Sequence, residues 1–377
     1  MSETATPSPR ERPLTGPQSV DRTVTLQDLV GSIEQRVERY LDLRGDKVEQ
    51  RDHLRHVANR TRWLYYTELQ RSKPGASVLI SSHEDALLDA CVLGHDMGKW
   101  IPRDELKALI PDDLSETSPV FQKLRLTPNQ IDLFALGVQR RFELETDGYT
   151  PEYDSAHHLV SAYILATDPA LGIGQIDAAD QERLINMIVG HQFGSYFKES
   201  LLHISLTDNA VTTGMLVDAA RPDRVAGDLL ASAFHDADIS DLLFVGSLES
   251  RPNREDIFHT GGLVKILMIN FANLITGAPG APATLNDCLR SCQLTVTNVC
   301  EEFLTATAVQ HGARWRKQAR RFLSLFREKA VFEKLDAALT PTGESLPPAE
   351  RLNTVRLLTH MQARAFLQGD DEEEEED

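Results

Sequence analysis

Residues 92–99 read Val92-Leu93-Gly94-His95-Asp96-Met97-Gly98-Lys99. A His and an Asp stand side by side at the end of an apolar run, and a Gly and a Lys follow at once. Neutral imidazole nitrogen and ionised carboxylate oxygen together suit one site for Mn, Fe, Co or Zn. Further histidines and an aspartate fall at helical positions before and after the pair. The stretch therefore predicts the centre of a metal site.

The pattern around this stretch is helical. Residues 26–43 and 53–69 place apolar side chains at helical spacing. Ser82 with Asp85 three residues later is typical of a helix start that leads into residues 86–97. Further helices are expected at 129–143, 154–166, 180–193, 225–245, 263–275, 285–311, 313–338 and 348–367. Alternating strand patterns are scarce, so the predicted fold class is all-α.

Composition limits the class of protein. The chain of 377 residues is 41% hydrophobic and 25% charged, as in a soluble globular protein. No apolar run reaches the roughly 20 residues of a membrane-spanning helix, and the start lacks a secretory pattern. Four cysteines do not suggest a disulfide framework in a chain of this length. These features predict a cytoplasmic protein with no membrane partner.

The charge distribution limits the partners. The formal net charge is −18, of which the eight acids at 370–377 supply −8. Tight binding to a nucleic-acid backbone needs clustered Lys and Arg, so a nucleic-acid partner is not expected. A small phosphorylated substrate remains compatible, because a metal and a few local cations outweigh distant charge. Residues 1–24 and the acidic run 370–377 are expected to be disordered tails.

The order of the metal-binding residue types resembles a known family. His, His-Asp and Asp in this order resemble the HD-domain superfamily of metal-dependent phosphohydrolases, which are all-α. Two intervening histidines extend the resemblance to the dinuclear subgroup, His … His-Asp … His … His … Asp, over roughly residues 50–245. The resemblance implies a metal-dependent hydrolase domain of HD type at 25–250, built as a helical bundle. Additional C-terminal helices at 251–369 lie outside it.

The resemblance also implies a ligand set. In the family, the first ligand is a His that is followed, after three residues, by Val-Ala. This pattern selects His53, which precedes Val57-Ala58. His, three residues and a small residue with Ala selects His157, before Ser161-Ala162, and Ala-Asp before an aliphatic residue selects Asp238. The implied metal ligands are His53, His95, Asp96, His157, His191 and Asp238, with Asp96 bridging two metals. The implied catalytic residues are Asp96 and Lys99.

Three of these ligands have a neighbour that stays an alternative. His56 competes with His53, His158 with His157, and Asp236 with Asp238. Adjacent helical residues differ by about 100° in direction, so usually only one of two neighbours aims at a shared point. Lys99 has two interpretations: a point charge for a substrate phosphate, or a cation at a helix end. Gly98 suits a helix C-terminus.

The function implied by the resemblance is hydrolysis. Two divalent metal ions, Fe or Mn first and Zn, Co, Ni or Mg as further candidates, would hold a bridging water and clamp a phosphoryl group. The substrate is expected to be a nucleotide or another small phosphorylated molecule. Cations between Lys99 and His157 are candidates for phosphate contacts: Arg103, Lys107, Lys123, Arg125, Arg140 and Arg141. A dinuclear-iron oxygenase of HD type and a regulatory or scaffold protein that keeps the fold are the alternatives.

Overall fold

The structure is a computed structural model of the chain. It describes residues 25–73, 80–111, 114–115, 117–144, 150–191, 225, 227–249, 256–277, 282–340 and 346–370. The tail predicted at 1–24 lies outside these residues, as does the tail predicted at 370–377 apart from Asp370, the last residue of a helix.

The described residues are mostly helical, which confirms the all-α class. The first group of helices comprises α1 (Leu26–Asp42), α2 (Lys47–Ser72), α3 (Ser82–Gly94), α4 (Met97–Trp100), α5 (Arg103–Leu109), α6 (Pro119–Leu124), α7 (Pro128–Glu143), α8 (Pro151–Thr167) and α9 (Ala178–Gly190), with a 3₁₀ turn, η1, at Ile173–Gln175. The second group comprises α12 (Leu229–Asp241), α13 (Gly262–Thr276), α14 (Leu285–Asn298), α15 (Ala306–Leu325), α16 (Lys329–Leu339) and α17 (Pro348–Asp370), with a 3₁₀ turn, η3, at Val299–Glu301.

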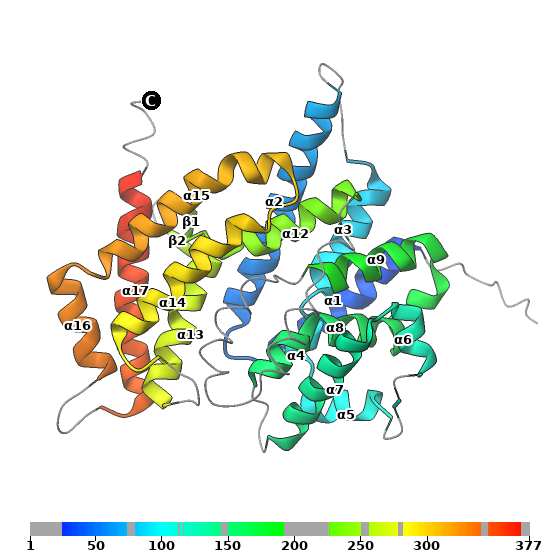
Figure 1. The fold of residues 1–377 in the computed structure, drawn as a ribbon, viewed down its shortest axis with the longest axis horizontal. Coiled ribbons are helices and arrows are strands. Elements are labelled where there is room, and N and C mark those ends of the chain that lie inside the picture. The colour runs from blue at the N-terminus through cyan, green and yellow to red at the C-terminus, as the bar shows by residue number, and fades with distance from the viewer. Residues whose placement is uncertain are drawn as a thin grey trace, which may run out of the picture.

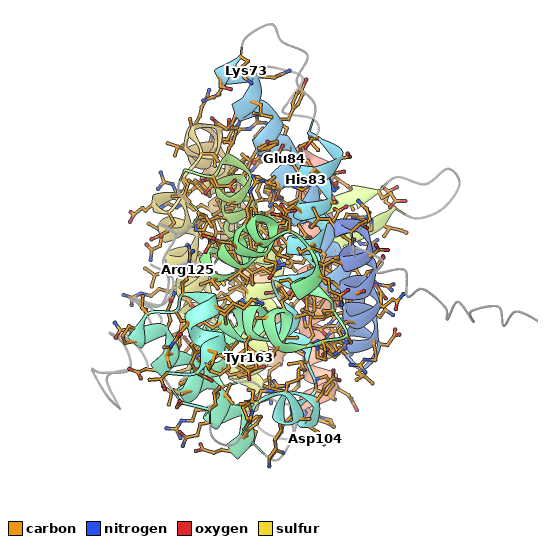
Figure 2. The ribbon with its side chains drawn as sticks, turned by 90° about the vertical axis from the view of Figure 1, so that its right-hand side faces the viewer. Lys73, His83, Glu84, Asp104, Arg125 and Tyr163 are labelled. Carbon is orange, nitrogen blue, oxygen red and sulfur yellow. The ribbon has the colours of Figure 1, made fainter. Side chains whose placement is uncertain are left out.

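Helices α2 and α12 pack along each other in the middle of the molecule. In Figure 1, α3 to α9 lie on one side of this pair and α13 to α17 on the other. In the view of Figure 2, Lys73, just beyond α2, and Asp104 of α5 lie at opposite ends of the molecule. Buried hydrophobic side chains form one connected cluster from Leu29 to Phe366. Helix α2 therefore touches both groups of helices.

Helix starts follow the capping chemistry of the sequence. Thr25, Thr127, Thr150 and Thr305 each accept a hydrogen bond from a backbone N–H in the first turn of their helix. The predicted start of α3 was wrong by one residue. Ser81, in extended conformation, is the N-cap and accepts from the backbone N–H of Glu84.

Two predicted long helices are broken in the structure. Residues 285–311 were expected to form one helix, but α14 ends at Asn298 and α15 begins after Thr305. The break is fixed by Asp236 of α12, which accepts hydrogen bonds from the backbone N–H groups of Leu304 and Thr305 and from the Thr305 hydroxyl. Residues 313–338 likewise divide between α15 and α16, with Glu328 as the N-cap of α16.

A small hairpin was missed from the sequence. Strands β1 (Gly246–Glu249) and β2 (Ile257–Thr260) pair antiparallel, with Gly246 opposite Thr260. Each strand has four residues, too few for an alternating pattern to stand out. The ring nitrogens of His259 in β2 are both hydrogen-bonded to carboxylates, Nδ1 to that of Asp52 in α2 and Nε2 to that of Glu249 in β1. The hairpin is therefore tied to the same helix that carries His53.

The helices give no indication of a membrane span. Among the described residues, no helix combines the length and the hydropathy that crossing a membrane would require. The division into 25–250 and 251–369 stays a prediction.

Candidate metal centre

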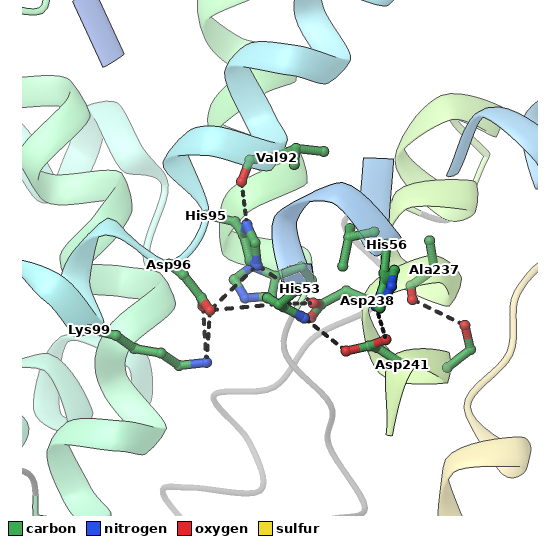
Figure 3. A network of polar contacts seen from close by, with 12 residues as sticks. His53, His56, Val92, His95, Asp96, Lys99, Ala237, Asp238 and Asp241 are labelled. Atoms are coloured by element: carbon green, nitrogen blue, oxygen red, sulfur yellow. Dashed lines mark hydrogen bonds and ion pairs between the residues drawn. The ribbon is translucent and has the colours of Figure 1, made fainter. Parts of the chain in front are cut away.

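The structure brings all six predicted metal ligands together. They come from five separate segments: His53 from α2, His95 and Asp96 from the turn between α3 and α4, His157 from α8, His191 from the end of α9, and Asp238 from α12. In Figure 3, His53, His95, Asp96 and Asp238 point toward one another. Residues up to 185 positions apart in sequence therefore meet at one point, as one metal centre requires.

One half of the cluster is formed by His53, His95 and Asp238. The Nε2 atom of His53 lies 3.3 Å from Oδ1 of Asp238, and that of His95 lies 3.5 Å from the same oxygen. Asp96 Oδ2 lies 3.8 Å from His53 Nε2 and 3.6 Å from His95 Nε2. Two ligand atoms that are each 2.0–2.2 Å from one metal lie about 3.0–3.6 Å apart. Three of the four separations lie within this range and the His53–Asp96 separation is 0.2 Å beyond it, so one cation could lie between these residues.

The other half is formed by His157 and His191. Their Nε2 atoms lie 3.3 Å apart, and His157 Nε2 lies 3.3 Å from Oδ1 of Asp96. His95, Asp96 and His191 also place one ligand atom each within 4.8 Å of one another. The two oxygens of Asp96 therefore face different groups of histidines, an arrangement that suits a carboxylate between two cations.

The histidines are held by their other ring nitrogen. The Nδ1 atom of His95 donates to the carbonyl oxygen of Val92 at 2.7 Å, and that of His191 to the carbonyl of Ile188 at 2.6 Å. His157 makes the same contact to a carbonyl three residues earlier, that of Asp154. A hydrogen bond at Nδ1 fixes the tautomer and leaves Nε2 as a lone-pair donor. The shared pattern directs all three Nε2 atoms at the centre.

Burial and charge fit a cation at this position. The Nε2 atom of His95 is buried and has no hydrogen-bond partner among the described residues. A buried polar atom without a partner is costly, which is the situation that a bound ion relieves. Burial raises the pKa of Asp96, but Lys99, His95 and His157 lower it by more, to well below its usual range. The centre therefore offers an ionised carboxylate.

Lys99 lies against the carboxylate of Asp96. Its Nζ is 3.0 Å from Oδ1, and its side chain is 30% exposed. Burial lowers the pKa of Lys99, but Asp96 and other carboxylates raise it by more, so the group stays charged. Figure 3 shows the ammonium beside the cluster. The cation is thus placed where it can meet both Asp96 and an incoming anion.

The predicted role of Gly98 was wrong. Helix α3 ends at Gly94, and Gly98 lies inside the short helix α4. A Cβ at this position would lie 2.3 Å from the carbonyl oxygen of His157, and the Gly98 N–H donates to the Ser161 hydroxyl at 2.8 Å. Gly98 is therefore needed for the close approach of α4 to α8, which sets Asp96 against His157.

Two of the three neighbours that were kept as alternatives face other groups. His56 faces Asp241, with Nδ1 3.8 Å from Oδ1 of that residue. His158 is buried beside the cluster, with its ring centroid 5.7 Å from that of His157 and 6.1 Å from that of His191. Asp236 is used by Leu304 and Thr305 at the start of α15. The geometry favours His53, His157 and Asp238, whose roles as ligands stay predictions.

A buried carboxylate beside the centre was missed from the sequence. Asp241 is 1% exposed, and its Oδ2 accepts from Nδ1 of His53 at 2.9 Å. Burial raises the pKa of Asp241, but His53, Arg60 and Lys265 lower it to about 2. Asp241 follows Asp238 by three residues, so the two share one face of α12. That spacing is the feature of the sequence from which a role for Asp241 at the centre could have been predicted.

Helix α13 approaches the same carboxylate. A Cβ on Gly262 would lie 2.6 Å from the carbonyl oxygen of Asp241, so only glycine permits this contact. One turn later, Lys265 lies among the charges of the centre: burial lowers its pKa, and Asp241 and Asp96 oppose this effect. The C-terminal helices therefore add a cation near the centre that the resemblance does not cover.

Four of the six candidate cations between Lys99 and His157 contact other groups. Arg103 donates to the carbonyl of Phe142 and Arg141 to that of Ile101. Arg125 pairs with Glu182, and Arg140 with Glu143. Their assignment to a substrate phosphate rests on sequence alone.

Comparison with protein-family models, with curated proteins and with solved structures gives no match to this chain. The site is therefore interpreted from its own geometry: a buried His/Asp cluster, in a helical protein, that could hold a metal ion.

Proposed function

We propose that this protein is a metal-dependent phosphohydrolase of HD type, which cleaves a phosphoester or phosphoanhydride of a nucleotide or other small phosphorylated molecule. The observation that carries the proposal is the position of Asp96. Its two oxygens face two groups of histidines, and a lysine ammonium lies on it at 3.0 Å. This arrangement supplies both a carboxylate for two cations and a positive charge for a phosphoryl oxygen.

The proposed ligands are His53, His95, Asp96 and Asp238 on one side and His157, His191 and Asp96 on the other. Divalent ions in such a site lower the pKa of bound water toward neutrality and neutralise the charge of a phosphoryl group. The donor set of nitrogen and carboxylate oxygen suits Fe or Mn, with Zn, Co, Ni and Mg as further candidates.

The protein's own residues then have defined roles. The backbone carbonyls of Val92, Asp154 and Ile188 hold the imidazoles in place before substrate arrives. Phe234 packs edge-on against the rings of His95 and His191, with centroids 5.5 and 6.0 Å apart, and excludes water from that side. Lys99 offers its ammonium to the anionic substrate. Such preorganised charge is the main source of rate in phosphoryl transfer.

The first test is an activity screen on the full chain. Protein stripped with chelator and reloaded singly with Mn, Fe, Co, Ni, Zn or Mg should release phosphate or nitrophenol from nucleotides or from bis(p-nitrophenyl) phosphate. Asp96→Ala should lower turnover by at least about 100-fold, because loss of a bridging carboxylate removes charge from both halves of the site. Circular dichroism should show that the variant keeps its helices.

Asp132→Ala is the matched control, since Asp132 is an exposed acid on α7. Its turnover should equal that of the wild type. Hydrolysis that persists in a folded Asp96→Ala variant would refute the proposal. Turnover that requires iron and consumes oxygen would show that the protein is an oxygenase and not a hydrolase.

A further inference from the structure

A second concave site lies between α2 and α15, apart from the metal centre. This α2–α15 groove has a volume of about 490 Å³, within the range of small-molecule sites. The side chains that decide its chemistry are Arg60 and Trp63 of α2, Phe244, and His311, Arg314 and Trp315 of α15. Nothing in the proposed hydrolysis uses them.

The groove has an aromatic wall. Trp63 is 40% exposed although it is a large indole. His311 stacks on Trp315 with centroids 5.8 Å apart and 24° between the planes, and it meets Trp63 edge-on at 5.3 Å. These contacts hold Trp63 in place while part of its ring faces solvent. A fixed, exposed indole is suited to stacking on a planar ring of a ligand.

The groove is also cationic. The guanidinium of Arg60 lies 3.6 Å from the centroid of the Phe244 ring, and Arg314 is exposed at the edge of the groove. None of the described residues that line the groove is acidic, and Asp241, which pairs with Arg60 at 3.5 Å, is buried. Guanidinium groups bind phosphate through charge-assisted hydrogen bonds, and an exposed aromatic ring stacks on a planar base. The ligand that fits is therefore both aromatic and anionic.

The groove continues along the helix face that leads from the metal centre. His53 and Arg60 lie on nearly the same line of α2, about 10 Å apart along its axis, and Trp63 lies about 60° around the helix from Arg60. Arg60 lies 3.5 Å from Oδ1 of Asp241, whose Oδ2 holds His53. The groove is thus a separate site that shares a buried carboxylate with the centre.

We propose that the α2–α15 groove binds a nucleotide, with the base stacked on Trp63 and the phosphate held by Arg60 and Arg314. Its volume fits a single nucleotide. A longer nucleic acid would leave the groove for the surface of a strongly acidic protein, which opposes it. This inference does not depend on hydrolysis at the metal centre.

Tryptophan fluorescence tests the proposal directly. Of the three tryptophans, Trp63 and Trp315 line the groove, and Trp100 is buried in α4. Titration of the full-length protein with AMP should change the emission and saturate. Adenosine should bind at least about five-fold more weakly, because it lacks the charge that the arginines attract, and inorganic phosphate should not change the emission at the same concentrations.

Variants separate the groove from the centre. Isothermal titration with AMP should show at least about ten-fold weaker binding for Trp63→Ala and for Arg314→Gln, with Trp63→Phe restoring much of the loss by supplying another ring. Arg140→Gln, which removes an exposed arginine of α7, should bind as the wild type does. Protein stripped of metal with a chelator should keep its affinity for AMP, because the groove contains none of the proposed metal ligands.

Two results would overturn the proposal. The first is AMP binding that survives both Trp63→Ala and Arg314→Gln but is lost in the metal-stripped protein, which would place the nucleotide at the metal centre. The second is a ten-residue oligothymidylate that binds more tightly than AMP, which would make the groove a site for single-stranded nucleic acid. The absence of saturable AMP binding also refutes it. If the activity screen finds no hydrolysis, the expected binding of AMP to the groove is unchanged.

Discussion

At the scale of single residues, the centre depends on which side of each helix a side chain occupies. His53 and His56 differ in direction along α2, and only His53 has its Nε2 within 4 Å of both Asp96 and Asp238. Asp236 and Asp238 are nearly opposite on α12, and only Asp238 faces the histidines. The sequence left both choices open because spacing does not fix the rotation of a helix.

His53→Ala should lose more metal than His56→Ala. His53 belongs to the cluster, whereas His56 faces Asp241 and burial lowers its pKa to about 4. Elemental analysis of both purified variants should show at least about half of the bound metal lost in the first and little change in the second. Equal losses in both, or a larger loss in His56→Ala, would mean that the assignment is off by one turn of α2.

Asp241→Asn should weaken metal binding by about 10- to 100-fold while the protein stays folded, because a carboxylate on Nδ1 orients the ligating imidazole and raises its basicity. Competition with a chelating dye measures the affinity. The control is Asp180→Asn, which changes an acid of α9 that pairs with His83 away from the cluster. Affinity equal to that of the wild type in Asp241→Asn would show that this contact has no role at the centre.

At the scale of elements, the helices around the centre followed from sequence better than those beyond it. Apolar spacing placed α1 and α8 to within three residues at each end, and it placed the start of α2 six residues too late. The predicted helix 285–311 failed, because its break depends on Asp236, which lies 68 residues before Leu304. The two strands of the hairpin were not predicted, because each has only four residues. The local sequence pattern predicts helices that are long and amphipathic. It does not predict a helix boundary that is set by a side chain far away in sequence.

Asp236→Ala should destabilise the fold without removing a metal ligand. The substitution leaves the backbone N–H groups of Leu304 and Thr305 without their acceptor, which costs about 1–3 kcal/mol. Urea denaturation should show this loss in the free energy of unfolding, and amide exchange should speed up first at the start of α15. Asp287→Ala, at the exposed first turn of α14, is the control and should cost less. Unchanged stability in Asp236→Ala would contradict the role of Asp236 as the link between α12 and α15.

At the scale of the whole molecule, the centre joins helices that are distant in sequence. It takes residues from α2, α8 and α12, from the turn after α3 and from the end of α9, and α2 and α12 also contact the C-terminal helices. The sequence predicted the class of fold and the residues of the cluster. It did not predict Asp241 or Lys265, because both act from the C-terminal side of the site, beyond or at the edge of the resemblance. A metal at this junction should stabilise the whole protein.

Metal loading should therefore raise the melting temperature. An ion that binds only the folded chain adds about 2.7 kcal/mol of stability at 100 times its Kd. Calorimetry of chelated and reloaded protein measures the shift, with Ca²⁺ as a control ion because it prefers oxygen ligands. The shift should disappear in Asp96→Ala. A melting temperature that no transition metal changes would argue against a structural link between the centre and the fold.

The most direct test of the central claim is the number of metal ions per chain. Elemental analysis of the full-length protein, purified without chelator and reloaded with Mn, should give two ions per chain, because His53, His95 and Asp238 form one half of the cluster, His157 and His191 the other, and Asp96 faces both. Asp96→Ala should reduce this number to one or fewer. A reproducible value at or below one ion per wild-type chain would contradict the dinuclear centre.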